Sequence, residues 1–217
     1  MTQRVVTLAH YYTAPEIQRM ADKVGDSLEL SLYARDAQAD IIVFAGVRFM
    51  AETAKILNPN ATVILPDAES TCSLVTQTDV TALAAWRQRY ADYVHVSYIN
   101  SSAEHKALSD WIVTSRNVDD IIAHLYAEGK KVIFSPDRNM GGYLNHQYGY
   151  DMPLWSAVST FTSIDRPTRS ASAPDSLITC SRRAESSGLV VAAFRAAKKL
   201  SKPPLRLLLS SLSTVSS

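Results

Sequence analysis

The sequence predicts an α/β protein made of two related domains, each with a parallel sheet covered by helices. Up to about residue 160, short apolar runs rich in β-branched residues alternate with helix-forming segments. This alternation is typical of buried parallel strands joined by helices. Residues 1–75 and 80–160 each contain three such strand–helix units, which is a loose internal repeat. A change of composition near residue 160 ends the pattern.

Six buried strands are expected from the short apolar runs. The runs are Val5–Ala9, Ile41–Ala45, Thr62–Leu65, Val94–Tyr98, Ile112–Thr114 and Val132–Ser135. Each is short, apolar and rich in β-branched side chains, as strands covered on both faces are.

Capping signals place helices between these strands. Thr13–Glu16 has the spacing of a capping box, with a proline in the first turn. Ser101–Glu104 repeats that spacing. Asn117 is expected to cap a helix whose first turn carries Asp119 and Asp120, where carboxylates suit the helix dipole.

The domain bounds follow from the pattern and the charge. We expect one domain over residues 1–78, a second over 79–160, and a biased, disordered tail over 161–217. Residues 164–217 carry nine Lys or Arg against three Asp or Glu, a net charge of +6, whereas residues 1–163 carry −5. Residues 164–217 also hold twelve serines and no Tyr or Trp. Such a shift is typical of a disordered tail or of foreign sequence.

Bulk composition argues against nucleic acid and membrane partners. The formal charge of the whole chain is +1, and no apolar run approaches the roughly 20 residues needed to cross a bilayer. The first residues contain no extended apolar segment of the kind found in signal peptides. Two cysteines do not make a disulfide framework. A cytoplasmic protein is therefore expected.

Polar side chains follow nearly every expected strand. They are His10, Asp67, Tyr98, Asn100, Ser115 and Asp137. In open parallel sheets ligands bind beyond the carboxyl ends of the strands, where helix N-termini offer free N–H groups to anions. The arrangement predicts a site for a polar, anionic small molecule. The alternative is that these residues are ordinary caps and turn formers.

Several of these residue types can carry chemistry. His10 can donate a hydrogen bond to a carboxylate or titrate near neutral pH, and Tyr12 can donate a phenolic proton. Ser27 supplies a hydroxyl at a helix start, where an N-cap is the alternative role. Cys72 follows the third strand, and neither it nor Cys180 forms a local zinc motif. The other histidines are assigned to the core or the surface: His95, His105, His124 and His146.

Eight sequence blocks occur in a consistent order between residues 5 and 155. They are Ala9–Tyr12 with Pro15–Gln18, Ala21–Asp22 with Gly25–Leu28, Ala39–Phe44, Gly46–Pro59, Thr71–Leu74, Tyr98–Glu104, Thr114–Asn117 and Ser135–Gly141. In the wording and spacing of these blocks the chain resembles the quinolinate synthase family.

The resemblance implies a fold of three related αβα domains around a central site. It implies a transferase of NAD biosynthesis that condenses iminosuccinate with dihydroxyacetone phosphate to quinolinate. A [4Fe–4S] cluster held by one cysteine from each domain is the implied cofactor, with an open iron position that acts as a Lewis acid. L-aspartate oxidase or aspartate dehydrogenase is the implied functional partner.

The resemblance also implies roles for individual residues. Carried over by motif, Cys72 is the first cluster ligand, and Tyr12 and Tyr98 are the catalytic residues. The implied substrate contacts are His10, Ser27, Tyr98, Ile99, Asn100 and Ser115.

The resemblance stops near residue 155. Ser156–Phe161 stands where a second cysteine in a Cys-x-Val-His setting is expected, and the third cysteine and a His-Pro-Glu segment have no counterpart. The tail is either a shifted reading frame or divergent sequence. Three functions follow: an active quinolinate synthase, a non-catalytic remnant, or an α/β module that binds a dicarboxylate or triose phosphate without chemistry.

Overall fold

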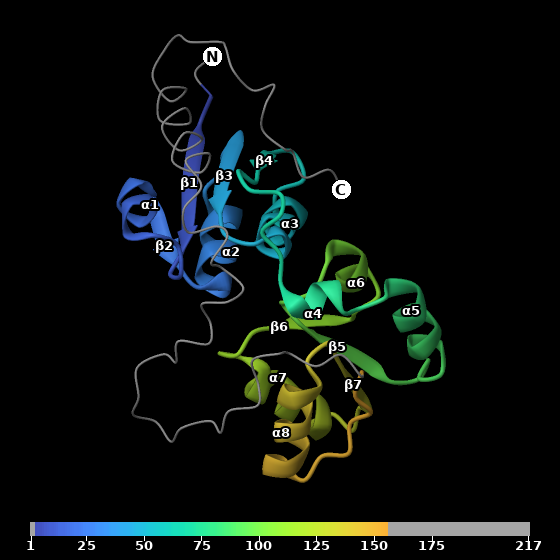
Figure 1. Ribbon diagram of the computed structural model, residues 1–217. Helices are drawn as coiled ribbons and strands as arrows, with labels where there is room; N and C mark the ends of the chain where they lie inside the picture. The colour runs from blue at the N-terminus through green and yellow to red at the C-terminus, as the bar shows by residue number, and fades with distance from the viewer. Residues whose placement is uncertain (1–2, 156–217) are drawn as a thin grey trace. The chain divides into compact units, whose positions relative to one another are not determined.

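The computed structural model describes residues 3–155. They fall into two compact units, residues 3–71 and residues 72–155, each built around its own sheet (Figure 1). The predicted fold class, two α/β domains with parallel sheets, is confirmed. The predicted bounds of the domains stay a prediction, and the tail over residues 161–217 lies outside the described residues.

The first unit alternates strands and helices along its whole length. Its elements are β1 (Val5–His10), α1 (Pro15–Met20), β2 (Lys23–Gly25), α2 (Ser27–Asp36), β3 (Ile41–Ala45), α3 (Arg48–Leu57) and β4 (Thr62–Ile64). All strand pairs are parallel, and the strand order is β2-β1-β3-β4. The core beside this sheet consists of Ala9, Ile17, Ile41, Val43, Ala45 and Ile64.

The second unit begins with two helices and then repeats the alternation. Its elements are α4 (Ser73–Thr76), α5 (Val80–Gln88), β5 (Val94–Tyr98), α6 (Ala103–Ala107), β6 (Trp111–Val113), α7 (Val118–Ala127), β7 (Val132–Ser135) and α8 (Arg138–Tyr148). The strand order is β6-β5-β7, again parallel. The chain then runs beside β7, where the amide of Trp155 donates to the Phe134 carbonyl over 3.0 Å.

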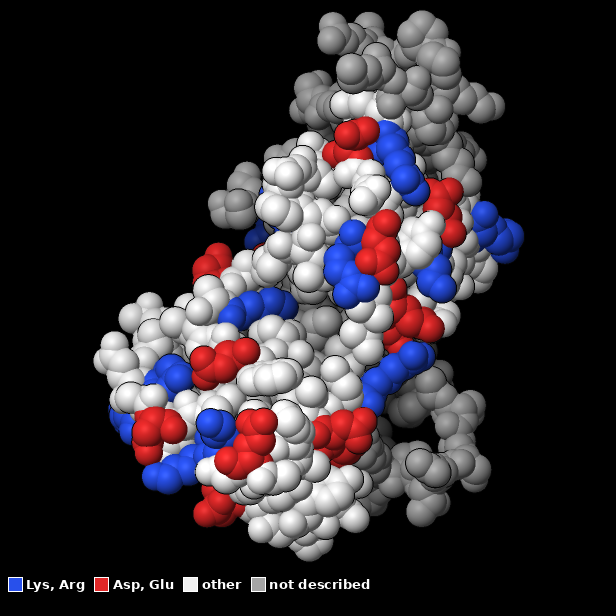
Figure 2. Space-filling view, turned by 180° about the vertical axis from the view of Figure 1, so that it is seen from behind, with Lys and Arg blue, Asp and Glu red and all other residues white. Residues whose placement is uncertain are grey.

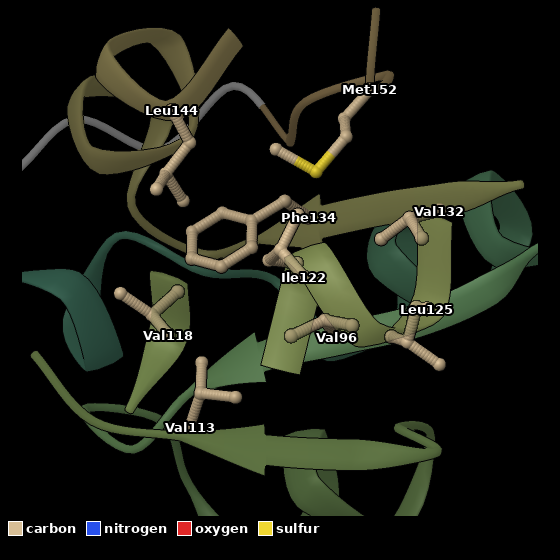
Figure 3. Packing of buried hydrophobic residues seen from close by; sticks show 9 residues of the cluster. All are labelled: Val96, Val113, Val118, Ile122, Leu125, Val132, Phe134, Leu144 and Met152. Carbon is tan, nitrogen blue, oxygen red and sulfur yellow. The ribbon is translucent and has the colours of Figure 1, made fainter. Parts of the chain in front are cut away.

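The two faces of the second sheet differ in chemistry. Successive side chains of a strand point to opposite faces. Val96, Val132 and Phe134 lie on one face and pack with side chains of α7 and α8, as Figure 3 shows. The intervening residues His95, Ser97 and Ser135 therefore lie on the other face, where all three are buried. One face is an apolar core and the other contains a polar layer.

The predicted repeat is present, and the first sheet has one strand, β2, that the sequence did not predict. The orders β2-β1-β3 and β6-β5-β7 match, and β4 extends the first sheet beyond β3. The strand β2 is missing from the sequence prediction because Lys23–Gly25 has three residues and one apolar side chain that could signal a strand. It forms because it pairs with the end of β1, with Leu8 opposite Lys23 and His10 opposite Gly25.

Three predicted caps are corrected in detail. Pro15 is the first residue of α1 as expected, but the hydroxyl of Thr13 donates to the His10 carbonyl over 2.8 Å instead of capping. Ser102, one residue later than predicted, caps α6. Asn117 holds the N-cap position of α7, yet its side chain accepts from the Thr114 amide over 2.7 Å. In each case a nearer turn competes for the side chain.

Charges are mixed over the surface. On the face drawn in Figure 2, acidic and basic side chains alternate and neither sign gathers into a large patch. Exposed ion pairs such as Lys131 with Asp92, at 3.0 Å, contribute to this mixture. None of the helices α1–α8 is long and apolar enough to cross a membrane.

Candidate functional site

In the first unit the candidate residues gather where β1 and β2 end. His10 is the last residue of β1, and its ring lies 4.0 Å from the ring of Tyr12, tilted by 34°. The Tyr12 hydroxyl lies 3.5 Å from the sulfur of Met50, the third residue of α3. The structure therefore brings the rings of His10 and Tyr12 together at the end of β1.

His10 is a neutral imidazole. Burial lowers the pKa of His10 from 6.5 to about 4, and the nearby carboxylate of Asp26 opposes that shift only in part. Its Nδ1 atom is buried and has no hydrogen-bond partner among the described residues. A buried polar atom without a partner is costly, and a ligand group is one way in which it can be satisfied.

Ser27 is the first residue of α2 and not its cap. Asp26 holds the cap position, where its carboxylate accepts from the Glu29 amide over 2.8 Å. The Glu29 side chain completes a capping box by accepting from the Asp26 amide over 3.2 Å. The capping role that was the alternative for Ser27 therefore belongs to Asp26. Ser27 is half-buried, two residues beyond the end of β2.

In the second unit the structure brings Cys72 and Asn100 together. Cys72 is 4% exposed and stands at the N-cap of α4. The side-chain amide of Asn100 donates to its sulfur over 3.7 Å. Asn100 comes two residues after the end of β5, so the thiol lies at the carboxyl end of that strand.

The turn Tyr98–Ser102 is tied down by its own backbone. The Ile99 amide donates to the Val113 carbonyl on β6 over 2.8 Å, and the Ser101 amide donates to the Ile99 carbonyl over 2.8 Å. The Ser101 hydroxyl donates to the Tyr98 carbonyl over 2.9 Å. Ile99 is 5% exposed and Ser101 is 1% exposed, whereas Tyr98, Asn100 and Ser102 are half-buried, so a solute can reach these three side chains of the turn.

Ser115 occupies the position in the second unit that Ser27 occupies in the first. Ser27 comes two residues after β2, and Ser115 comes two residues after β6. These strands are equivalent edge strands of the two sheets. Ser115 is exposed. The repeat thus places a serine hydroxyl beyond the same strand in both units.

Two of the polar residues after strands are structural. The carboxylate of Asp137 caps α8 by accepting from the Asn139 amide over 3.0 Å and the Met140 amide over 3.2 Å. Burial raises the pKa of Asp137. Asp67 accepts from the Glu69 amide over 3.1 Å in a turn. For these two carboxylates the alternative interpretation, caps and turn formers, describes what the side chains do.

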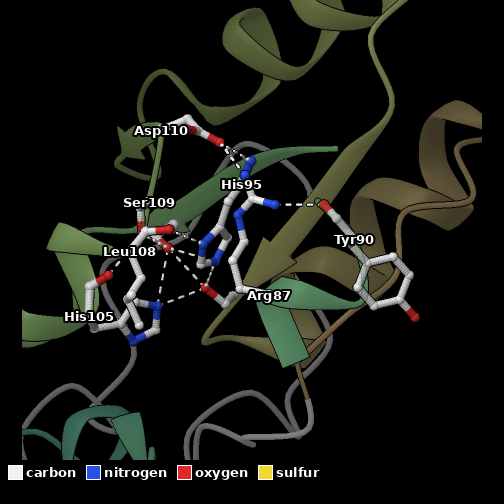
Figure 4. Close-up of polar contacts among 9 residues, drawn as sticks. Arg87, Tyr90, His95, His105, Leu108, Ser109 and Asp110 are labelled. Atoms are coloured by element: carbon white, nitrogen blue, oxygen red, sulfur yellow. Dashed lines mark hydrogen bonds and ion pairs between the residues drawn. The ribbon is translucent and has the colours of Figure 1, made fainter. Parts of the chain in front are cut away.

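Sequence reasoning missed a buried polar cluster on the second sheet. Five histidine and serine side chains meet there: His95, Ser97, His105, Ser109 and Ser135. Figure 4 labels His95, His105 and Ser109 among them. The alternation of Val94–Tyr98 contained the signal, because His95 and Ser97 are two residues apart and share a face. Ser70, whose buried hydroxyl has no partner among residues 3–155, was also missed.

The described residues contain no local metal centre. Within residues 3–155, no three His, Cys, Asp or Glu side chains gather so that they could hold an ion. Cys72 is the cysteine of this part of the chain, and Cys180 lies outside it.

Comparison with known proteins identifies the family. The profile described as "Quinolinate synthetase A protein" matches residues 1–165. The quinolinate synthase of Prosthecochloris aestuarii is 50% identical over 153 residues, which are 70% of this chain and 47% of the relative. That of a Synechocystis species is 53% identical over 150 residues, 69% of this chain and 47% of the relative.

The sequence identity to the quinolinate synthases is high, but the alignment covers only part of their length. The quinolinate synthase of Chlorobium phaeobacteroides is 51% identical over 69% of this chain and 46% of the relative. The chain thus spans about half the length of the curated relatives it matches. With a family profile over residues 1–165 and identities near 50%, the chain belongs to the quinolinate synthase family.

Proposed function

We propose that the chain works in quinolinate synthesis and that its two units bind iminosuccinate and dihydroxyacetone phosphate with side chains at their strand ends. The two substrates contain the seven carbons of quinolinate, and their condensation releases phosphate and two molecules of water. The overall reaction is therefore a transfer that needs no oxidant. The observation that supports this proposal most directly is the unpartnered, buried Nδ1 of His10 at the carboxyl end of β1.

His10 is proposed to bind a carboxylate of iminosuccinate. A neutral imidazole has one N–H donor and one acceptor, so it can donate to a carboxylate without a fixed positive charge. Tyr12, whose ring lies against His10, is proposed to transfer a proton to or from the same substrate.

The second unit is proposed to position the substrates. Tyr98 presents a phenol for proton transfer, and the amide of Asn100 can both donate and accept beside Cys72. Ile99 contributes shape and its backbone rather than a reactive group. Ser27 and Ser115, beyond equivalent edge strands, are proposed to donate to carboxylate or phosphate oxygens.

Cys72 is proposed as one ligand of the [4Fe–4S] cluster that the family implies. When bound, such a cluster supplies Lewis-acid chemistry at an open iron position. The described residues offer a single thiol and no group of three metal-binding side chains, so by themselves they do not fit a four-iron cluster. The roles proposed above therefore belong to protein side chains alone.

The chemistry also implies a supplier of substrate. Iminosuccinate is an imine of the aspartate skeleton, so a reaction that removes two electrons and two protons from aspartate is one source of it. L-aspartate oxidase or aspartate dehydrogenase is accordingly the proposed functional partner.

Calorimetric titration of the chain with malate, a stable dicarboxylate, tests this proposal. His10→Phe keeps a ring beside Tyr12 and removes both nitrogens. We expect it to weaken malate binding about 10-fold or more, the cost of one hydrogen bond to a charged group. His124→Phe, at an exposed histidine on α7, should leave the affinity unchanged. Equal affinity of the wild type and His10→Phe would remove His10 from the proposed site.

A second candidate is a module that binds these ligands without chemistry. The observation that favours it is the single described thiol. Malate binding together with failure to make quinolinate, under conditions that load clusters into other proteins, would select this candidate over the enzyme.

A further inference from the structure

The short helix α6, which follows the turn Tyr98–Ser102, is anchored by polar side chains. Helix α6 has five residues and directly follows the turn Tyr98–Ser102. Isolated helices of this length are unstable, so α6 depends on contacts with the rest of the unit. Its buried residues are His105 and Lys106. An imidazole and an ammonium group are therefore among the side chains that hold α6 in place.

His105 connects α6 to two strands of the second sheet. Its Nε2 atom lies 2.7 Å from the Ser135 hydroxyl oxygen on β7 and 3.1 Å from that of Ser97 on β5. His105 is 1% exposed, and both serines are fully buried. Burial, with the charge of Lys106 and the ring of His95 nearby, lowers the pKa of His105 to about 3. The imidazole is therefore neutral at physiological pH.

The neighbouring histidine fixes part of the proton arrangement. His95 Nδ1 lies 2.8 Å from the Leu108 carbonyl oxygen, which only accepts, so this nitrogen carries the proton. His95 Nε2 is then an acceptor. The Ser135 hydroxyl oxygen lies 2.6 Å from this nitrogen and that of Ser97 lies 3.2 Å from it, and we assign the donor role to the nearer Ser135.

The serine hydroxyls determine where the remaining protons of the cluster lie. The Ser109 hydroxyl donates to the His105 carbonyl over 3.0 Å, and it accepts from Ser97 over 2.6 Å. With the protons of Ser97 and Ser135 thus used, His105 Nε2 carries the proton that Ser135 accepts. His105 Nδ1 is then a bare acceptor, which agrees with its having no partner among the described residues. In this arrangement every buried proton of the cluster has an acceptor.

The same helix is tied to the turn in front of it. The Lys106 ammonium donates to the Ser101 carbonyl, and the Ser102 hydroxyl accepts from the His105 amide over 3.2 Å. The turn is thus fixed to α6, and α6 is fixed by His105 to β5 and β7.

We propose that His105 is a positioning residue that holds the turn Tyr98–Ser102, and with it Tyr98 and Asn100, against the sheet by donating from Nε2 to Ser135. The inference rests on the proposed roles of Tyr98 and Asn100 in substrate binding. Loss of the donor frees α6 and loosens the turn, while the apolar face of the sheet, packed by α7 and α8, keeps its structure.

Hydrogen exchange of the full chain, read by mass spectrometry, tests this directly. His105→Gln keeps an uncharged N–H donor near the Nε2 position, whereas His105→Leu removes it. We expect amides of residues 98–109 to exchange about 10-fold faster or more in His105→Leu and to stay near wild type in His105→Gln. Amides of α7 should not change in either variant, and His124→Gln is the control.

Three results would overturn the proposal. They are unchanged exchange over residues 98–109 in His105→Leu, equal loosening of α7, and a His105→Gln variant as loose as His105→Leu. If His105→Leu does not fold, Ser135→Ala removes the acceptor instead and is expected to loosen the same segment without affecting α7.

Malate titration separates this inference from the proposed function. In His105→Leu the affinity for malate should fall about 10-fold and in His105→Gln it should be retained. A wild-type chain that binds no malate would contradict the proposed function, whereas the exchange comparison would still decide whether His105 positions the turn.

Discussion

Buried histidines make the stability of this chain depend on pH in the acidic range. The pKa of His10 is lowered to about 4 and that of His105 to about 3, both chiefly by burial, and the pKa of His95 is lowered for the same reason. In the unfolded chain a histidine binds its proton near pH 6.5. Between pH 6.5 and these lowered values the unfolded state therefore binds more protons than the folded state.

We therefore predict that the free energy of unfolding is flat above about pH 6.5 and decreases as the pH falls below it. Each neutral histidine contributes a slope of up to about 1.4 kcal/mol per pH unit. His105→Gln should reduce the slope between pH 6 and 4 by about one histidine's share. Urea unfolding at several pH values measures this, and His124→Gln, at an exposed site, is the control. An unchanged slope in His105→Gln would mean that His105 is not buried and neutral.

At the scale of elements, short buried strands rich in apolar and β-branched residues could be predicted from sequence. The expected strands Ile41–Ala45, Val94–Tyr98 and Val132–Ser135 agree with β3, β5 and β7 to the residue. Lys23–Gly25 could not be predicted, because its strand character comes from pairing with β1 and not from its own side chains. The cap of α2 was misplaced by one residue because Asp26 and Ser27 are both good caps.

The residues of the candidate site were predicted in part. His10 ends β1, and Cys72 and Asn100 come after β4 and β5, so their placement near strand ends is visible in the sequence. The lowered pKa of His10 and the buried histidine–serine cluster could not be predicted from the sequence. Both depend on the packing of the folded chain, through burial and through cross-strand contacts such as that of His105 with Ser135.

Two adjacent glycines in α8 give a matched test of its packing. A Cβ on Gly141 would lie 2.5 Å from Leu154 Cδ2 and 3.0 Å from Phe134 Cδ1, whereas a Cβ on Gly142 would meet nothing within 4 Å. We predict that Gly141→Ala destabilises the chain by about 1–3 kcal/mol through overpacking. Gly142→Ala should stabilise it by up to about 1 kcal/mol, because alanine favours a helix.

Thermal or urea unfolding of these two variants measures the difference. If Gly141→Ala were as stable as Gly142→Ala, the packing of α8 against Leu154 and β7 would be wrong.

At the scale of the whole molecule, the chain contains the side chains proposed here to bind substrate, and its full sequence has two cysteines. A [4Fe–4S] cluster held by three cysteines needs one thiolate more than these two. We predict that the 217-residue chain, treated anaerobically with iron and sulfide and supplied with iminosuccinate and dihydroxyacetone phosphate, forms no quinolinate by itself. Quinolinate formation together with the absorbance of a four-iron cluster would contradict this prediction.

The central claim is that each unit binds substrate groups at the carboxyl ends of its parallel strands. Nuclear magnetic resonance spectra of the labelled chain, recorded during titration with malate and then with dihydroxyacetone phosphate, test it most directly. We predict saturable chemical-shift changes at His10, Tyr12, Ser27, Tyr98, Asn100 and Ser115. Little change is expected at the amino ends of the same strands, such as Val5 and Val94. Saturable shifts confined to the amino ends, or no saturable shifts with either ligand, would contradict it.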